Sequence, residues 1–254
     1  MQIFCYIIFM FTFTPIPFLK YGFIELPTHG LLMAAAFLVG EILARREARR
    51  RGLSPDLVDN ATVIAAVAGL IGARLVYVLV FGQQMSFVEM LSIWDGGLSS
   101  HGGYVFGVIA GLVYLKLKKC DLRAYADAVF PFLLIGWAIG RLGCFINWDS
   151  FGKVTSTFLS VVVYGEARYP TQLYEAFGYV AFFVILRFLL KPRLKMFGRP
   201  GVEAAAAAIF FSTTRIIVDF WRDELGTYMI VSRFVTIAVL IAAVIYILSA
   251  LKRR

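Results

Sequence analysis

Long apolar runs recur along almost the whole chain and restrict its fold more than any other feature. A helix needs about 20 mainly apolar residues to cross a bilayer. Seven runs approach or reach that length, at residues 27–44, 61–81, 102–117, 129–146, 172–190, 202–219 and 229–250. The sequence therefore predicts an all-α polytopic membrane protein with a bundle of about seven transmembrane helices over residues 27–250. The connections leave no room for a soluble domain, so we expect a single integral membrane domain over residues 1–254.

Basic residues gather at alternate connections between the runs. Lysines and arginines near the ends of a span are retained on the cytoplasmic side. Of the 25 basic residues, 17 fall in three alternate connections and the C-terminal tail. These are Arg45, Arg46, Arg49, Arg50 and Arg51, then Lys116, Lys118, Lys119 and Arg123, then Arg187, Lys191, Arg193, Lys195 and Arg199, and finally Lys252, Arg253 and Arg254. We therefore expect the N-terminus outside and the C-terminus in the cytoplasm.

The first 19 residues, MQIFCYIIFMFTFTPIPFL, are also apolar, but Pro15 and Pro17 interrupt them. They lack the basic start and the small-residue cleavage site of a signal peptide. We interpret residues 1–26 as an interfacial or re-entrant segment on the outer face. An eighth span is the alternative, although it would reverse either the side of the N-terminus or the distribution of basic residues.

Charge and cysteine content exclude other classes of function. The net charge of +9 follows from the uneven distribution of basic residues between the two membrane faces, so we expect no nucleic-acid partner. Cys5, Cys120 and Cys144 lie far apart, without the spacing of a disulfide framework or a zinc site. We therefore expect no metal, no cofactor and no redox chemistry.

Three arginines stand within or at the ends of apolar runs: Arg74, Arg141 and Arg215. Each costs about 2.5 to 3.5 kcal/mol at a helix centre on insertion scales, which disfavours an unpaired position facing lipid. In the predicted topology all three lie in the outer half of outward-running helices, so we expect them to converge near the outer headgroups. Snorkelling arginines that tie helices together are the alternative. Three arginines on three helices at the same membrane depth favour an anion site, because a guanidinium group makes paired hydrogen bonds with phosphate.

Further polar residues are predicted on the same face. Asp219 follows Arg215 by four residues and shares its side of the helix, with Arg222 one turn later. An ordinary ion pair at a helix end is the alternative for this pair. Gln172 and Glu175, three residues apart, can project from one helix face into the same region.

The stretch WDGGLSSHGG, residues 94–103, places His101 between two glycine pairs, the second being Gly102 and Gly103. Glycines permit unusual backbone conformations and the close approach of a ligand. A single histidine in a membrane protein is usually a hydrogen-bonded structural group. The second interpretation is that His101, which lies beside a glycine-rich loop on the outer face, transfers a proton at neutral pH.

Four motifs in order carry a resemblance to a known family. WDGGLSSHGG, GRLGCFIN followed by an acid and a glycine, YPTQLYE, and RIIVDFWR closely resemble motifs of the prolipoprotein diacylglyceryl transferases. The similarity runs from about His29 to Arg222, and the order of four separate motifs makes it specific. It implies a bacterial inner-membrane enzyme with its active site toward the outer leaflet.

The resemblance also implies a reaction and its partners. Such an enzyme takes the diacylglyceryl group from phosphatidylglycerol, joins it by a thioether to the lipobox cysteine of a preprolipoprotein signal peptide, and releases glycerol phosphate. Membrane lipids surround it, and the sequence makes no prediction of its oligomeric state. A thiol near its free pKa of about 8.5 is a poor nucleophile. His101 is the candidate base, and Arg141 and Arg215 are the candidates to stabilise the departing phosphate.

By similarity, His101, Arg141 and Arg215 form the catalytic group. The surrounding lipid-binding motif is matched by Asn147, Asp149, Gly152 and Asp219, and Arg74 matches a family arginine. Gly102, Gly103, Gln172, Glu175 and Arg222 complete the predicted substrate-binding set.

The chain departs from the family pattern at several positions. His29 stands where the family usually has tyrosine, Cys144 where it has asparagine, and Trp148 where it has glycine. Asp149 and Asp219 stand where glutamates are common. We transfer no role to His29 or Cys144, and expect Cys144 to be a small buried thiol that fills space. The alternative function is a divergent paralogue that binds phospholipid without transfer, or acts on another lipid or acceptor.

Overall fold

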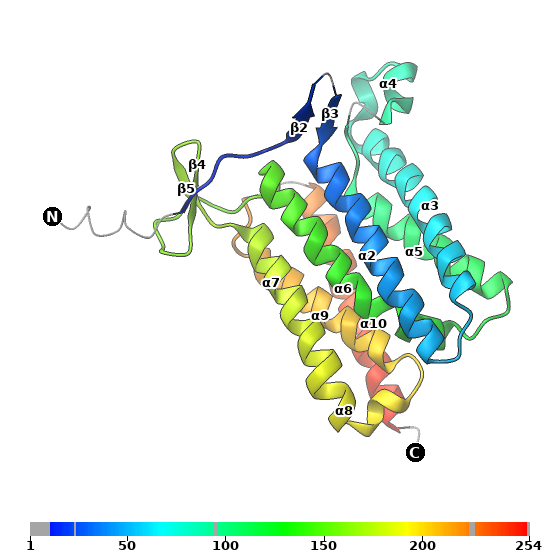
Figure 1. Ribbon diagram of the computed structural model, residues 1–254. Coiled ribbons are helices and arrows are strands. Elements are labelled where there is room, and N and C mark those ends of the chain that lie inside the picture. The colour runs from blue at the N-terminus through cyan, green and yellow to red at the C-terminus, as the bar shows by residue number, and fades with distance from the viewer. Residues whose placement is uncertain (1–10, 23, 94–95, 224–226, 253–254) are drawn as a thin grey trace. The chain divides into compact units, whose positions relative to one another are not determined.

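The computed structural model describes residues 11–22, 24–93, 96–223 and 227–252 (Figure 1). Helices dominate this part of the chain, and each predicted apolar run closely coincides with one of them. The long helices are α2 (Thr28–Arg50), α3 (Pro55–Phe81), α5 (Ser100–Leu117), α6 (Leu122–Asn147), α7 (Thr171–Val184), α9 (Val202–Val218) and α10 (Thr227–Lys252). Shorter ones are α4 (Phe87–Leu91), α8 (Lys191–Arg193), the π-helical turn Ile185–Leu190, and 3₁₀ turns at Gly82–Gln84 and Lys195–Gly198.

Five helical segments in the described residues are long and apolar enough to cross a membrane: Thr28–Arg50, Pro55–Phe81, Leu122–Asn147, Thr171–Arg193 and Ser232–Lys252. A sixth apolar stretch, Gly102–Leu117, is shorter. The prediction of an all-α, multi-pass membrane protein is confirmed. The count of seven spans and the outside position of the N-terminus stay predictions.

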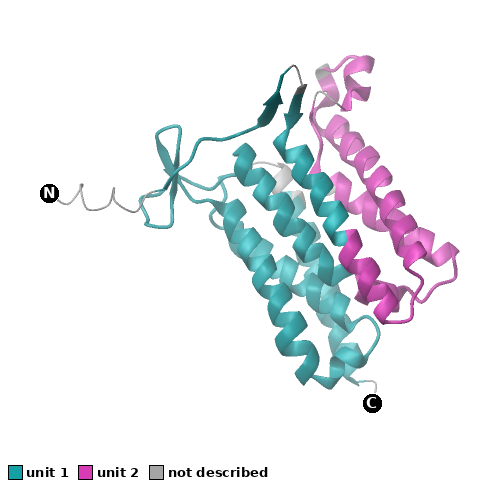
Figure 2. Cartoon of the chain, in the orientation of Figure 1, with its two compact units in different colours: residues 1–40, 130–254 teal, residues 41–129 magenta. Residues whose placement is uncertain are grey.

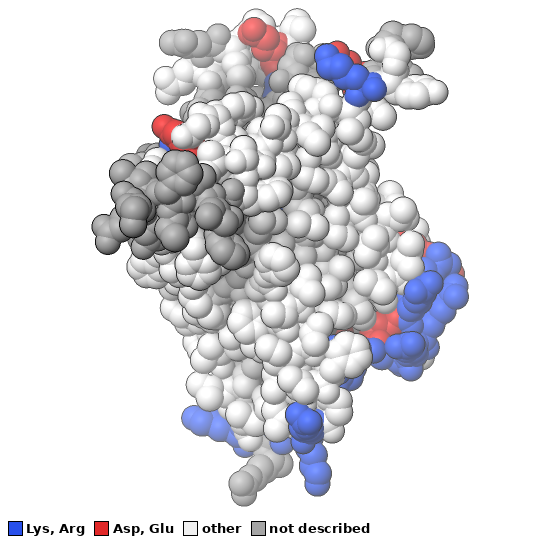
Figure 3. All heavy atoms as spheres, turned by 60° about the vertical axis from the view of Figure 1, so that its left-hand side comes forward, with Lys and Arg blue, Asp and Glu red and all other residues white. Residues whose placement is uncertain are grey.

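The helices expose large apolar side chains that water would not favour. Leu79, Phe177 and Phe234 are 74%, 72% and 70% exposed. Most of the surface visible in Figure 3 is uncharged, and its lysines and arginines gather in separate clusters. Extended apolar surface of this kind marks contact with lipid or another apolar partner. The surface therefore agrees with the membrane interpretation.

The chain divides into two compact units, which we describe separately (Figure 2). Unit 1 comprises residues 1–40 and 130–254, and unit 2 comprises residues 41–129.

In unit 1, small residues let helices approach one another closely. A Cβ on Gly136 of α6 would lie 3.4 Å from the carbonyl of Ala36 on α2, and one on Gly143 would lie 3.2 Å from His29 Nδ1. Helix α9 buries four consecutive alanines, Ala204–Ala207, and packs against α7 and α10. Small residues at helix contacts favour backbone approach in membranes. The N-terminal ends of α2 and α7 meet the C-terminal ends of α6 and α9.

Short strands replace helix in the described part of the N-terminal segment. Strand β1 (Phe11–Thr12) pairs in parallel with β4 (Val161–Val163), which pairs antiparallel with β5 (Glu166–Arg168). Strands β2 (Phe18–Tyr21) and β3 (Ile24–Pro27) form a separate antiparallel hairpin. Residues 1–10 lie outside the described part, and the membrane depth of residues 1–26 stays a prediction.

In unit 2, α3 and α5 pack through facing glycines. A Cβ on Gly107 would lie 2.9 Å from the carbonyl of Ala65, and one on Gly103 would lie 3.6 Å from that of Gly69. A Cβ on Gly102 would overlap the backbone of Gly72. These glycines are needed because the two helix backbones nearly touch.

Candidate functional site

A buried glutamate gathers three arginines in unit 1. Glu175 lies in the second turn of α7 and is completely buried. Its Oε1 atom is 3.2 Å from Arg215 Nη1 and 2.9 Å from Arg222 Nη2, while its Oε2 atom pairs with Arg141 Nε. These arginines come from α9, from the segment just after it, and from α6. We call Glu175, Arg141, Arg215 and Arg222, together with Asp219, the arginine cluster.

Asp219 provides the second carboxylate of the cluster at the C-terminal end of α9. Its Oδ1 atom is 3.5 Å from Arg215 Nε and 3.4 Å from Arg222 Nε, so the predicted pairing of Arg215 with Asp219 is present. Arg233 of α10 approaches Oδ2 at 3.8 Å, a contact that sequence spacing could not reveal. Three arginines around two carboxylates leave a formal excess of positive charge. The cluster is therefore suited to an anion.

The loop after α6 is held by a contact of its own and by one from the first turn of α7. Asn147 Nδ2 donates to Asp149 Oδ2 at 2.9 Å, and the buried Gln172 donates to the Asp149 carbonyl at 2.6 Å. Trp148 and Ser150 both have positive φ angles, 56° and 55°. Such angles are costly for residues other than glycine and persist where surrounding contacts demand them. The loop is thus held in one specific conformation beside the arginines.

Gly152 is required by packing. Its N–H donates to the Tyr169 carbonyl at 3.0 Å, and the residue forms an isolated antiparallel bridge with Arg222. A Cβ here would lie 2.6 Å from Tyr169 Cβ and 2.7 Å from the Trp221 carbonyl oxygen. Gly152 therefore helps to position Arg222.

Arg168 of β5 also holds the loop after α6 in place. It donates to the Gly152 carbonyl at 3.2 Å and to Asp223 Oδ2 at 2.6 Å. The hydrogen bond to Asp223 raises the pKa of Arg168, so the guanidinium stays charged.

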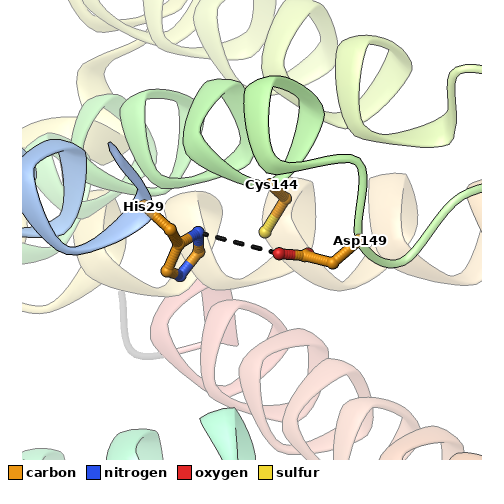
Figure 4. Close-up of side chains that lie close together, drawn as sticks. All are labelled: His29, Cys144 and Asp149. Atoms are coloured by element: carbon orange, nitrogen blue, oxygen red, sulfur yellow. Dashed lines mark ion pairs between the residues drawn. The ribbon is translucent and has the colours of Figure 1, made fainter. Parts of the chain in front are cut away.

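His29 and Cys144 also lie at this end of unit 1. His29 Nδ1 is 3.9 Å from Asp149 Oδ2 (Figure 4). Arg141 Nη1 is 3.7 Å from Cys144 Sγ. Sequence spacing gave no sign that His29 meets Cys144 and Asp149, because the three residues come from α2, the end of α6 and the following loop.

Arg74 belongs to unit 2 and has different partners. It is almost fully buried and donates to the carbonyls of Gly96 at 2.6 Å, Gly97 at 2.9 Å and Met90 at 3.1 Å, and also to that of Glu89. These contacts match the alternative of an arginine that ties segments together. Its predicted phosphate contact stays a prediction.

His101 lies in the first turn of α5, and its side chain lies outside the described part of the structure. The helix begins with a cap in which Ser99 Oγ accepts from the Gly102 N–H at 3.4 Å. Gly102 and Gly103 face α3, so their packing role is clear, while the predicted roles of all three residues toward a substrate stay predictions.

Comparison with known proteins identifies the family. The model of the prolipoprotein diacylglyceryl transferase family matches residues 16–250. The chain belongs to this family. Its relatives include a phosphatidylglycerol–prolipoprotein diacylglyceryl transferase of Mannheimia succiniciproducens, 32% identical over 95% of this chain and 94% of the relative. A protein of the same name from Trichormus variabilis is 32% identical over 86% of this chain and 81% of its own length. One from Clostridioides difficile is 36% identical over 64% of this chain and 66% of its own length. The resemblance inferred from the four motifs is confirmed.

Proposed function

We propose that this protein transfers the diacylglyceryl group of phosphatidylglycerol to the thiol of the lipobox cysteine in a preprolipoprotein signal peptide, and releases glycerol phosphate. Family membership supports the reaction class. The observation that carries the proposal is the arginine cluster, in which Arg141 and Arg215 share the buried carboxylate of Glu175.

The reaction displaces a phosphate ester from carbon, so negative charge grows on the departing oxygen. A preorganised positive group stabilises such charge strongly in a site that excludes water. Arg141 and Arg215 are the proposed groups. Glu175 holds both guanidinium groups in place, and the excess positive charge of the cluster attracts the phosphate. Asp219 and Arg222 position Arg215 through the contacts described above.

The remaining residues have supporting roles in this proposal. Asn147, Asp149, Gly152 and Gln172 shape the loop that adjoins the arginines, where the lipid headgroup would bind. His101 is the sequence-based candidate for the base that takes the thiol proton, and Arg74, Gly102 and Gly103 stay sequence-based candidates for lipid binding.

We infer that the protein lies in the bacterial inner membrane with its active site toward the outer leaflet. The bacterial origin of the relatives supports this location, and the distribution of basic residues in the sequence supports the orientation. Membrane lipids would then supply the donor laterally.

The test is an assay in detergent with labelled phosphatidylglycerol and a lipobox peptide, read as thioether-linked product. Arg141→Ala should lower the rate about 10²- to 10³-fold, the typical loss when one oxyanion-stabilising donor is removed. Arg193→Ala, which removes an exposed arginine of α8, is the matched control and should leave the rate unchanged. An unaltered rate in Arg141→Ala would contradict the proposed role.

A further inference from the structure

Three potential metal ligands converge at the outer end of unit 1. His29 stands in the first turn of α2, Cys144 in the last turn of α6, and Asp149 in the loop that follows. Their ligand atoms all lie within 4.8 Å of one another, and Figure 4 shows the thiol and the carboxylate directed toward the imidazole. Nitrogen, sulfur and oxygen donors of these types are the ligands that zinc prefers.

Of the three side chains, His29 lacks a hydrogen-bond partner at Nδ1 among the described residues, whereas Cys144 Sγ accepts from Arg141 and Asp149 Oδ2 accepts from Asn147. His29 Nδ1 is also shielded from solvent. Its distance of 3.9 Å to Asp149 Oδ2 is too long for a hydrogen bond. Two ligands of a tetrahedral zinc ion lie about 3.4 Å apart, given metal–ligand bonds of about 2.0 to 2.2 Å. Small side-chain movements would therefore complete the site.

The surroundings hold the ligands in place. Asn147 Nδ2 donates to Asp149 Oδ2, the kind of contact that orients a metal-binding carboxylate. Gly143 has no side chain to obstruct His29, since a Cβ there would lie 3.2 Å from Nδ1. The thiolate of Cys144 and the carboxylate of Asp149 would neutralise the two charges of Zn²⁺. Arg141, near the Cys144 sulfur, is itself paired with Glu175.

We propose that His29, Cys144 and Asp149 bind one Zn²⁺ ion and that its fourth position takes the sulfur of the acceptor cysteine. Three protein ligands and one open position are the arrangement of catalytic zinc sites. This inference rests on the proposed function. It gives the acceptor thiol a second means of activation, in addition to the candidate base His101.

The chemistry balances without a redox partner. Coordination to zinc would lower the pKa of the acceptor thiol, and its proton passes to the base of the proposed function, for which His101 is the candidate. The sulfur electron pair forms the bond to the glyceryl carbon. The bond from that carbon to the phosphate oxygen breaks, and its electron pair leaves with glycerol phosphate. Arg141 links the proposed zinc site to the proposed phosphate site, because it contacts Cys144 and belongs to the arginine cluster.

Metal binding is tested first, without lipid or peptide. Chelator-treated protein in detergent is titrated with Co²⁺ as a spectroscopic probe and with Zn²⁺ in competition. We expect about one equivalent to bind, with tetrahedral cobalt bands and a thiolate-to-cobalt absorption. Cys144→Ser and Asp149→Asn should lose stoichiometric binding, and the absorption should vanish in Cys144→Ser. Cys120→Ser, which removes a free thiol elsewhere, is the matched control and should bind normally. Equal spectra in Cys144→Ser and the original protein would overturn the proposal.

The open position is tested with the acceptor peptide alone. A lipobox peptide should shift the cobalt bands, whereas the same peptide with serine in place of cysteine should not. An unchanged spectrum at saturating peptide would overturn the role in thiol activation. Neither measurement depends on lipid transfer, so a metal site without diacylglyceryl transfer would contradict the proposed function only, and transfer by metal-free protein would contradict this inference only.

Discussion

Two arginines buried to the same degree have opposite surroundings. Arg74 in unit 2 and Arg215 in unit 1 are 8% and 7% exposed. Arg74 donates to backbone carbonyls of residues 89–97, which are neutral and fixed in the chain. Arg215 pairs with the carboxylates of Glu175 and Asp219, which it shares with other arginines. Equal burial therefore does not imply an equal role, and the partners separate a structural tie from a candidate anion site.

The largest expected effect comes from removing the shared carboxylate charge. Glu175→Gln leaves three guanidinium groups, two of them buried, around a neutral side chain, and loss of one partner from buried ion pairs costs about 3 to 5 kcal/mol. Denaturant titration in detergent measures the change in unfolding free energy. Glu166→Gln, in the exposed hairpin, is the control and should change it by less than about 0.5 kcal/mol. Comparable losses in the two variants would show that the cluster is not held by Glu175.

A smaller effect is expected when the positive charge at position 215 is kept but the planar guanidinium group is lost. Arg215→Lys retains the positive charge but cannot contact Glu175 and Asp219 at once, as the guanidinium does. Loss of one charged hydrogen bond in the transition state should lower the transfer rate about 10- to 100-fold. Steady-state assays with phosphatidylglycerol measure it, with Arg193→Lys as the control. A rate equal to that of the control would mean that point charge alone suffices.

The sequence predicted most of the fold because apolar length is a local property. The seven runs coincide with helices, since each needs only its own residues to be recognised. The pairing of Arg215 with Asp219 was also predictable, because four residues make one helical turn. The role of Glu175 as the centre of three arginines was not, since its partners lie 34, 40 and 47 positions away and only packing brings them together.

The same limit applies to the contacts of Arg74 and His29, which spacing could not reveal. Depth in the membrane suggested that Arg74 acts with Arg141 and Arg215, but depth does not specify which groups a side chain meets. Spacing of the cysteines could not reveal the group around Cys144, because the other two side chains are a histidine 115 positions earlier and an aspartate in the following loop. Residue type and spacing predict contacts within one helix and miss contacts between helices.

Removing the Arg74 guanidinium tests its assignment as a tie. Arg74→Ala leaves several backbone carbonyls of unit 2 without their donor, and one unsatisfied buried polar group costs about 1 to 3 kcal/mol. Hydrogen exchange should accelerate in α4, whose residues Glu89 and Met90 supply two of the carbonyls, and remain unchanged in α9. Unchanged exchange in α4 would contradict the assignment.

The smallest expected effect is a pH dependence of α4. Ser86 and Glu89 form a capping box, with the Ser86 N–H donating to Glu89 Oε2 at 2.7 Å. This hydrogen bond lowers the pKa of Glu89. A carboxyl group whose pKa is lowered by folding stabilises the folded form above its unfolded pKa of about 4.3, and loses that contribution as the pH falls through the folded value. Protection of α4 amides should therefore decline below about pH 4.3. Glu89→Gln removes the titrating group but retains a capping-box residue, so its α4 amides should not show this decline. If protection of the α4 amides in Glu89→Gln still declines below about pH 4.3, a titrating group other than Glu89 determines the pH dependence of α4.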